Sequence, residues 1–446
     1  MPLSRARHPV PGDDATTTLR DVTEYRPGLA GIRLPPLYRV FRDFPRPRID
    51  DLAEAVRRQV AGAEVTATLA GAATVAVAVG SRGIAGIDVI VRTLIEELRS
   101  TGREVFVVPA MGSHGGATAS GQVDVLAHLG ITESTVGAPI RSSMETVEIA
   151  TVVSPHGGTV PVATDALAWG DADAVVPVNR VKPHTGFHGP VESGLCKMLA
   201  IGLGKHDGAA RLHREGYGTF DSLVLEVARA ILDAGRVAFG LAVVENAYEE
   251  TAMVEAVPAS RIVSREQELL EEARRLMPRL PGRQIDVLVV ERFGKNLSGV
   301  GMDPNVTGRG ELGIALAGFE GPHIERIVVL SLTPETEGNA HGIGLADLIT
   351  EDVLDRIDRR TTWTNTLTAG SLACGRMPIA LPTEQLAIAA AADTLPGVRP
   401  EEARIVRIKD TLSLSEIAVS EVLAESLGGQ GDCEVAGRWD GTWHRV

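Results

Sequence analysis

Short apolar runs rich in β-branched residues alternate with amphipathic stretches along most of the chain. The runs at Thr74–Val79, 104–108 and 174–178 are apolar at nearly every position. Amphipathic stretches with a helical period follow the first two runs, at 87–98 and 120–129. Continuous apolar strands are usually buried on both faces, and their alternation with helices is typical of a parallel sheet. The pattern therefore predicts an α/β fold.

A second strand–helix unit follows a charged helix predicted at 268–276. A capping box at 264–267 would start this helix, and Pro278 would end it. Because 446 residues exceed one ordinary core, we expect two α/β domains with mostly parallel sheets and an active-site cleft between them. We assign residues 1–277 to the N-terminal domain and residues 278–446 to a C-terminal α/β domain that closes the cleft.

The same patterns predict further elements. They are an N-terminal arm over residues 1–45 with a strand at 37–41, a helix at 49–60, a hairpin at 147–153 and 159–163, a helix at 220–234, strands at 237–244, 285–290, 326–332 and 404–409, and a helix at 384–392. The tail, which contains Trp439 and Trp443, is expected to fold back on the body.

Composition narrows the classes of partner. The net charge of −14 and the isoelectric point near 5.3 argue against nucleic acid or an anionic membrane as the main partner. No apolar run is long enough to span a bilayer, and the N-terminus lacks the apolar segment of a signal peptide. The three cysteines are far apart and form no CxxC pair, which disfavours a cysteine zinc site and fits a reducing cytoplasm.

Candidate chemistry is concentrated in residues 179–213, which hold four of the eleven histidines. Lys197 stands in this stretch within an otherwise apolar run, 195–201. Burial favours the neutral, nucleophilic form of an amine, although a lysine can also extend its head to water from a helix end. The flanking glycines and histidines, among them His213 sixteen positions downstream, favour a functional role.

Three predicted strands end in Gly- or Pro-rich loops that carry Arg82, His114 and His184. Ligands of parallel sheets bind at the carboxyl ends of the strands, so we expect these side chains to converge. A guanidinium and two imidazoles suit an anionic substrate and proton transfer. The backbone amides around Gly112 and Ser113 are also able to cradle a phosphate.

The second domain offers weaker candidates. A Gly-rich loop at 294–305 is either an irregular tight loop or that domain's side of the cleft, and it contains Lys295, Asn296, Asp303 and Asn305. His341 and Asp347 follow in a later loop. We interpret His8, His128 and His444 as ordinary surface residues.

The motifs PHTGFHG and SGLCK with a later histidine, preceded by GSRG and GSHGG, resemble those of the nickel-dependent lactate racemase family. This family comprises racemases and epimerases of 2-hydroxyacids that use a nickel-pincer nucleotide. The resemblance implies that Lys197 bonds covalently to this pyridinium bis-thiocarboxylate mononucleotide, with Gly112 and Ser113 near it. His213 would ligate nickel, a metal suited to a planar set of soft donors.

The resemblance also implies two acid/base histidines, His114 and His184, and a substrate-carboxylate arginine, Arg82. Hydride would leave C2 for the cofactor and return to the opposite face, while a histidine moves the hydroxyl proton on each side. Residues 1–277 would then be the catalytic and cofactor domain. Proteins that make the cofactor are implied partners, and a homodimer is left open.

Departures from the family's pattern concern the substrate. The family's acidic residue three positions before the arginine falls on Val79, and His188 competes with His184 for the second acid/base role. No match is found for the second-domain residues that close on lactate, and Lys295 and Arg309 are the nearest cations. The resemblance therefore carries the cofactor chemistry better than the substrate: we expect a 2-hydroxyacid, with a sugar acid as one candidate in place of lactate.

Two other functions are weighed against this one. In the first, His184, His188, His206 and His213 surround zinc in a hydrolase or lyase, although no HExxH motif is present. In the second, the chain is a non-catalytic binder of hydroxy acids or sugar acids on the same scaffold.

Overall fold

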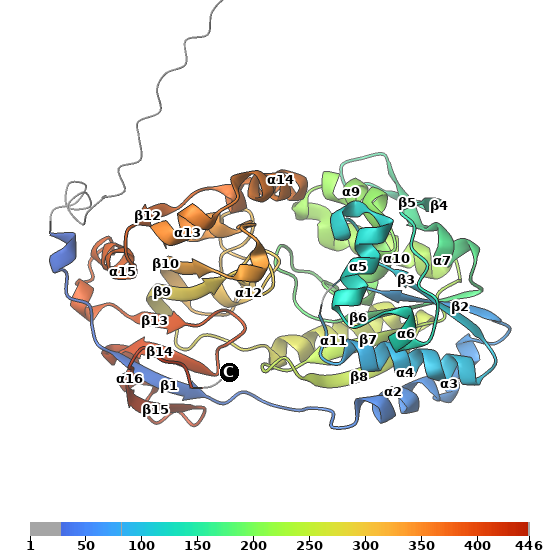
Figure 1. Ribbon diagram of the computed structural model, residues 1–446, viewed down its shortest axis with the longest axis horizontal. Helices are drawn as coiled ribbons and strands as arrows, with labels where there is room; N and C mark the ends of the chain where they lie inside the picture. Colours follow the sequence, from blue (N-terminus) through green and yellow to red (C-terminus); the bar gives the residue numbers. More distant parts are fainter. Residues whose placement is uncertain (1–27, 82, 445–446) are drawn as a thin grey trace, which may run out of the picture.

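The computed structural model describes residues 28–81 and 83–444, and it forms two lobes that are each built on one large sheet (Figure 1). The predicted arm therefore lies largely outside the described residues, as does Arg82. Both lobes have mostly parallel strands with helices packed on the sheets, so the predicted fold class is confirmed. No helix in the described part of the chain combines the length and the apolar character needed to cross a membrane.

The first lobe holds a five-stranded sheet in the order β3-β2-β6-β7-β8, in which all neighbours are parallel except β7 and β8. Its strands are β2 (Thr74–Val79), β3 (Glu104–Pro109), β6 (Ala174–Arg180), β7 (Phe239–Glu245) and β8 (Thr251–Pro258), and the predicted hairpin is β4 (Thr146–Val153) with β5 (Thr159–Asp165). Its helices are α2 (Leu52–Val60), α3 (Ala63–Thr68), α4 (Ile87–Ser100), α5 (Ala119–His128), α6 (Glu133–Val136), α7 (Ala166–Gly170), α8 (Leu195–Lys197), α9 (Lys205–Arg214), α10 (Phe220–Asp233) and α11 (Ile262–Leu276).

Burial on both faces explains the continuous apolar run of β2. Val75 and Val77 pack into one apolar cluster, and Ala76 and Ala78 pack into another, because successive side chains of a strand point to opposite faces. Helix α4 contributes to the first cluster and α10 to the second. The sheet is therefore the middle layer of a three-layer lobe.

The second lobe holds an eight-stranded sheet in the order β12-β11-β10-β9-β13-β14-β1-β15. The strands from β12 to β13 are parallel, and the remaining neighbours are antiparallel. The strands are β1 (Leu37–Arg42), β9 (Gln284–Phe293), β10 (His323–Leu332), β11 (Leu348–Thr350), β12 (Ile379–Leu381), β13 (Ile405–Ile408), β14 (Glu416–Ser420) and β15 (Cys433–Arg438), and the helices are α12 (Pro304–Thr307), α13 (Glu351–Arg356), α14 (Arg359–Ala369), α15 (Glu384–Asp393) and α16 (Glu421–Leu427).

Strand β1 lies in this second sheet although it belongs to the N-terminal part of the chain. It pairs with β14 on one side and with β15 on the other, and the segment that follows it runs across to α2 in the first lobe (Figure 1). The predicted return of the tail is confirmed, because Trp443 Nε1 donates to Glu291 Oε2 at 2.8 Å. The division of the chain at 277/278 stays a prediction.

One local prediction is wrong. The capping box proposed at 264–267 does not start helix α11, which begins at Ile262. Ser264 instead lies in the first turn, and its hydroxyl donates to the carbonyl of Arg261. The apolar residues on the buried face of this helix begin at Ile262, which lies before the proposed capping residues and is fully buried.

A fully buried ion pair fixes the start of helix α9. Lys205 Nζ lies 2.8 Å from Asp165 Oδ2 at the end of β5, and neither side chain is exposed. The same ammonium donates to the carbonyl of Pro109 at the end of β3. Because Asp165 also caps α7 through the backbone of Ala168, the pair joins two helices and two strands.

We expect Lys205→Met to destabilise the protein by about 3–5 kcal/mol, because it leaves the Asp165 carboxylate buried without its cation. Chemical denaturation measures this as a change in the free energy of unfolding. The matched control is Arg229→Met, which removes a half-exposed pair with Glu226 and should cost less than about 1 kcal/mol. Equal losses in the two variants would contradict the structural role of the buried pair.

Candidate active site

A cavity of about 680 Å³ lies between the two lobes. In the first lobe it is lined by residues at the carboxyl ends of four parallel strands, β2, β3, β6 and β7. In the second lobe the loops that follow β9 and β13 line it, so the carboxyl ends of strands from both sheets face one space. Open parallel sheets bind their ligands at this edge, and the volume is typical of a small-molecule site.

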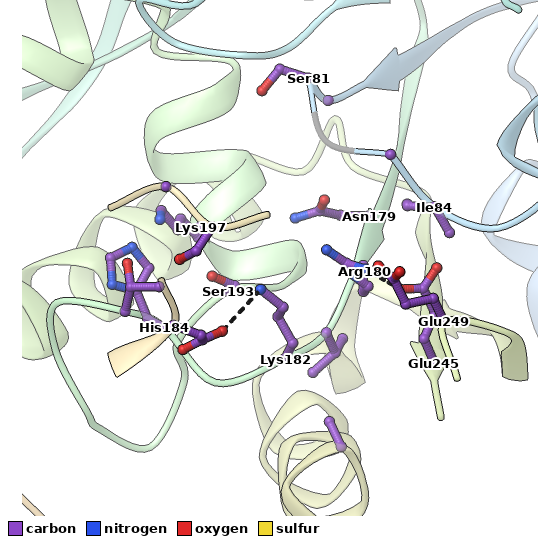
Figure 2. A pocket seen from close by; sticks show the side chains of 18 of the residues that line it. Ser81, Ile84, Asn179, Arg180, Lys182, His184, Ser193, Lys197, Glu245 and Glu249 are labelled. Carbon is purple, nitrogen blue, oxygen red and sulfur yellow. Dashed lines mark hydrogen bonds and ion pairs between the residues drawn. The ribbon is translucent and has the colours of Figure 1, made fainter. Parts of the chain in front are cut away.

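Lys197 projects into this cavity from the last residue of α8 (Figure 2). A π-helical turn, Met198–Gly202, follows it directly, and π-turns are frequent at functional sites. This turn packs closely on the end of β3, because a side chain at Gly202 would meet the carbonyl oxygen of Ala110 at 2.6 Å. Asn179 Nδ2 also donates to the carbonyl of Gly194, just before α8. The backbone around the lysine is therefore held from two strands.

Glu266 of α11 stabilises the same short helix from behind. Its carboxylate is buried and accepts from the backbone amide of Cys196 at 2.8 Å, and it sits against Gly194, where a side chain would collide with it. Burial raises the pKa of Glu266 to about 7, although the amides of Cys196 and Leu195 oppose this. Glu266 is thus a positioning residue for the segment that carries Lys197.

We expect the raised pKa of Glu266 to make stability depend on pH. The folded state keeps the proton up to about pH 7 while the unfolded chain loses it near 4.5, so stability falls as the pH rises between these values. Between pH 5 and pH 8 the loss should be about 2–3 kcal/mol. Glu266→Gln should remove this part of the pH dependence of unfolding, and Glu268→Gln, an exposed control on the same helix, should not.

His213 lies near Lys197 but does not line the cavity. It projects from α9, and its Nδ1 lies 2.6 Å from the carbonyl oxygen of Ala209. Burial lowers the pKa of His213, and the charge of Lys197 lowers it further. The ring is therefore neutral at pH 7, and a hydrogen bond at Nδ1 directs Nε2 toward any metal, as is usual for ligating histidines.

His114 and His184 both line the cavity. His114 follows β3 and is exposed, with its Nδ1 2.8 Å from the carbonyl oxygen of Met111. His184 follows β6 and is half-buried, and its Nδ1 accepts from the amide of Gly186 at 2.9 Å. In the sheet order β3-β2-β6 these two strands flank β2, so the two histidines come from loops that follow the strands on either side of β2.

A buried carboxylate in their loop holds His184 and His188 in different positions, and which of them acts as the acid/base stays a prediction. Glu192 accepts from the amide of His184 at 2.6 Å, and its oxygens lie 3.0 Å from Nδ1 of His188. Arg274 of α11 pairs with the same carboxylate. His188 is thereby turned to a separate depression, which it shares with Arg274, and it is absent from the lining of the main cavity.

The remaining candidate residues from the sequence also differ in whether they line the main cavity. Lys295 lines the cavity from the second lobe, and its ammonium donates to the carbonyl of Gly299 and to Asn365. Arg309 does not line it, because its guanidinium pairs with Asp347 at 2.7 Å. Neither Gly112 nor Ser113 lines the cavity: Gly112 is buried against Ile201 with a positive φ of 59°, and Ser113 is exposed.

Polar residues that the sequence analysis did not single out occupy the other side of the cavity. Arg180 at the end of β6 pairs with Glu245 at the end of β7, and Figure 2 shows Glu249 beside them. Lys182 reaches across to the second lobe, where Asp303 lies 3.9 Å away. Applying the strand-end rule to β6 and β7 would have found Arg180 and Glu245.

The four histidines considered for zinc do not form a common metal site. In the described part of the chain, one group of three or more His, Cys, Asp or Glu ligand atoms is close enough to share an ion, and it is Glu311, His341 and Cys374. His184 and His188 face different depressions. The arrangement therefore gives no support to a histidine zinc centre.

Comparisons with known proteins agree with this architecture. No family model matches the chain, and no curated protein matches it. Among solved structures, the lactate racemase apoprotein from Thermoanaerobacterium thermosaccharolyticum superimposes with a TM-score of 0.52 at 14% identity, over 85% of this chain and 99% of that one. A structural-genomics protein from Thermotoga maritima has the same TM-score and identity, over 83% and 99% of the two chains.

The molecule is thus a two-lobed α/β protein whose strand ends enclose a cavity with a lysine and two histidines. Its fold is that of the lactate racemase apoprotein, as the sequence resemblance predicted. At 14% identity this likeness concerns the fold, and the chemistry has to be argued from the residues of this chain.

Proposed function

We propose that the protein is a nickel-dependent isomerase that racemises or epimerises a 2-hydroxyacid. The observation that carries this proposal is that one cavity collects Lys197, His114 and His184, while the neutral imidazole of His213 lies close enough to sense the lysine's charge. A racemase of this kind needs an acid/base on each side of the substrate, because its two substrates are mirror images at C2. The lactate racemase fold supports the same activity.

Lys197 and His213 are the residues that we assign to a lysine-bound nickel-pincer nucleotide: Lys197 lines the cavity, and His213 neighbours the lysine outside the cavity lining. Lys197 would form the covalent bond, and Nε2 of His213 would be the protein's ligand to nickel, since its Nδ1 faces the carbonyl oxygen of Ala209. The cavity volume of about 680 Å³ leaves room for a mononucleotide together with a small acid. When bound, this cofactor would supply a reversible acceptor for the C2 hydride.

The chain's own residues would bind the acid and move its hydroxyl proton. A cation at the cavity, Lys295 or Lys182, suits the substrate carboxylate, and Arg82 remains the arginine proposed from the sequence. His114 or His184 would take the hydroxyl proton as C2 becomes a carbonyl carbon, and the other would return it after hydride arrives on the opposite face. The two lobes would exclude water from this step.

Polar groups on the far side of the cavity favour a substrate with several hydroxyls. Arg180, Glu245 and Glu249 offer both donors and acceptors there. Lactate, with its methyl group, brings no hydrogen-bonding group to this side of the cavity, whereas the hydroxyls of a sugar acid would donate to the carboxylates and accept from the guanidinium. We therefore infer a sugar acid or another hydroxylated 2-hydroxyacid as the substrate class.

The proposal is tested by measuring, for each acid in a panel of hydroxy acids and sugar acids, whether the protein inverts the configuration at C2. The protein is co-expressed with proteins that make the cofactor, and each enantiomer or epimer is followed by chiral chromatography. We expect turnover of at least one polyhydroxylated acid at a higher kcat/KM than lactate. Ligand binding without any interconversion across the panel, in protein that carries the added mass on Lys197, would instead favour a non-catalytic binder.

A further inference from the structure

A second cluster of ligand-type side chains lies in the C-terminal lobe. Glu311, His341 and Cys374 bring a carboxylate oxygen, an imidazole nitrogen and a thiol sulfur within 4.8 Å of one another. The three residues are 5%, 3% and 0% exposed, and none of them lines the cavity between the lobes. They come from three separate segments of the chain, so the fold rather than the local sequence assembles them.

The cluster places a buried carboxylate beside a thiol and an imidazole that carry no charge of their own, with the ammonium of Lys295 acting on both. Burial and the neighbouring Glu311 raise the pKa of Cys374 to about 12, so the thiol keeps its proton. Burial and the charge of Lys295 lower the pKa of His341 to about 4, so its ring is neutral and able to ligate. The carboxylate of Glu311 is buried, and its oxygens accept hydrogen bonds from the neutral hydroxyls of Thr185 and Ser371. A divalent cation would bind this carboxylate directly and displace the thiol proton.

Neighbouring side chains already hold the donors in ligating orientations. Nδ1 of His341 lies 3.0 Å from the hydroxyl of Thr366, which directs Nε2 as the ligand atom. Thr185 donates to Oε1 of Glu311 at 2.7 Å, and Ser371 donates to Oε2 at 3.4 Å. Hydrogen bonds of this kind to ligating histidines and carboxylates are a regular feature of metal sites.

We propose that Glu311, His341 and Cys374 bind a divalent transition-metal ion of the zinc class, at a site separate from the cavity that holds Lys197. One nitrogen, one sulfur and one oxygen donor suit zinc or cobalt, with water completing a tetrahedral set. Binding releases the Cys374 proton to solvent.

The site would also connect the two lobes. Thr185, which donates to Glu311, is the residue directly after His184 in the loop of the first lobe. A metal that fixes Glu311 would therefore fix one end of this loop as well. Asn305 adds to the same connection, because its Nδ2 donates to the carbonyl of His184 at 3.1 Å.

Cobalt(II) titration of the full chain tests this proposal. The protein is expressed without proteins that make the nickel cofactor, stripped with a chelator and titrated while the near-ultraviolet thiolate-to-cobalt charge-transfer band is recorded. We expect about one cobalt per chain, with the release of about one proton. Zinc should then displace the cobalt and abolish the band.

Variants distinguish this site from others. Cys374→Ser should abolish the band, and Cys433→Ser, which removes a cysteine of strand β15, should retain it. Thr366→Val, which keeps all three ligands, should weaken cobalt binding by about 10–100-fold. Lys197→Ala should leave the band unchanged, so failure of the proposed racemase chemistry would not affect this test.

Two results would overturn the inference. One is the absence of a charge-transfer band at saturating cobalt in protein whose circular dichroism is native. The other is a band that survives Cys374→Ser or disappears in Cys433→Ser, since the thiolate would then belong to another residue. Thermal unfolding of each variant separates loss of the ligand from loss of the fold.

Discussion

Replacement of Lys197 by alanine should abolish both the covalent addition to the protein and its racemase activity. No other residue in the proposed arrangement offers the bond to the cofactor, so activity should fall to the uncatalysed background. Intact-protein mass spectrometry after co-expression with cofactor-making proteins detects the addition directly. Chiral chromatography of the best substrate measures the activity.

The matched control for this experiment is Lys182→Ala. Lys182 lines the same cavity and lies 3.9 Å from Asp303, but it is not on the helix that precedes the π-helical turn. This variant should keep the added mass, whatever its effect on substrate binding. An added mass that survives in Lys197→Ala, or nickel held as tightly as in the parent protein, would refute the proposed attachment.

The second large effect is expected from the two cavity histidines. His114→Gln and His184→Gln should each reduce racemisation by about 10²–10⁴-fold, the usual range for loss of a general acid or base. Each variant should still oxidise one stereoisomer to its keto acid in a single turnover, because the histidine on that side remains. The two variants should retain opposite stereoisomers.

His188→Gln provides the contrast within the same loop. Its side chain faces the depression shared with Arg274 and contacts Glu192, so racemisation should be largely retained. Rapid-quench detection of the keto acid from each stereoisomer separates these cases. If His188→Gln lost activity as His184→Gln does, the assignment of the acid/base by cavity lining would be wrong.

Local sequence patterns predicted the strands and helices whose buried residues form an unbroken or regularly spaced apolar run. Strand β2 and helix α4 follow their predicted positions closely, because runs such as Thr74–Val79 are apolar on both faces of the sheet. The pairing of β1 with β14 could not be predicted, since it joins residues almost four hundred positions apart through ordinary backbone hydrogen bonds. Pairing at such a distance leaves no periodic signal in either strand.

The candidate site was predictable where strand ends carry unusual side chains. His114 and His184 were found this way, Lys197 was found as an amine within an apolar run, and the structure places all three on one cavity. The sequence could not show which of His184 and His188 lines the cavity, because their positions depend on contacts with Glu192, which also pairs with the distant Arg274. Arg309 was proposed for its charge alone, and its pairing with Asp347 takes it out of the cavity.

Strand β1 has a consequence for how this protein can be divided. It is an interior strand of the second sheet, between β14 and β15, yet it lies far from both in the sequence. A fragment that begins at residue 278 would lack this strand, and β15 would lose the neighbour with which it pairs. Recombination could therefore not exchange the C-terminal lobe as a single cassette, and any fragment-complementation design must supply residues 37–42 along with it.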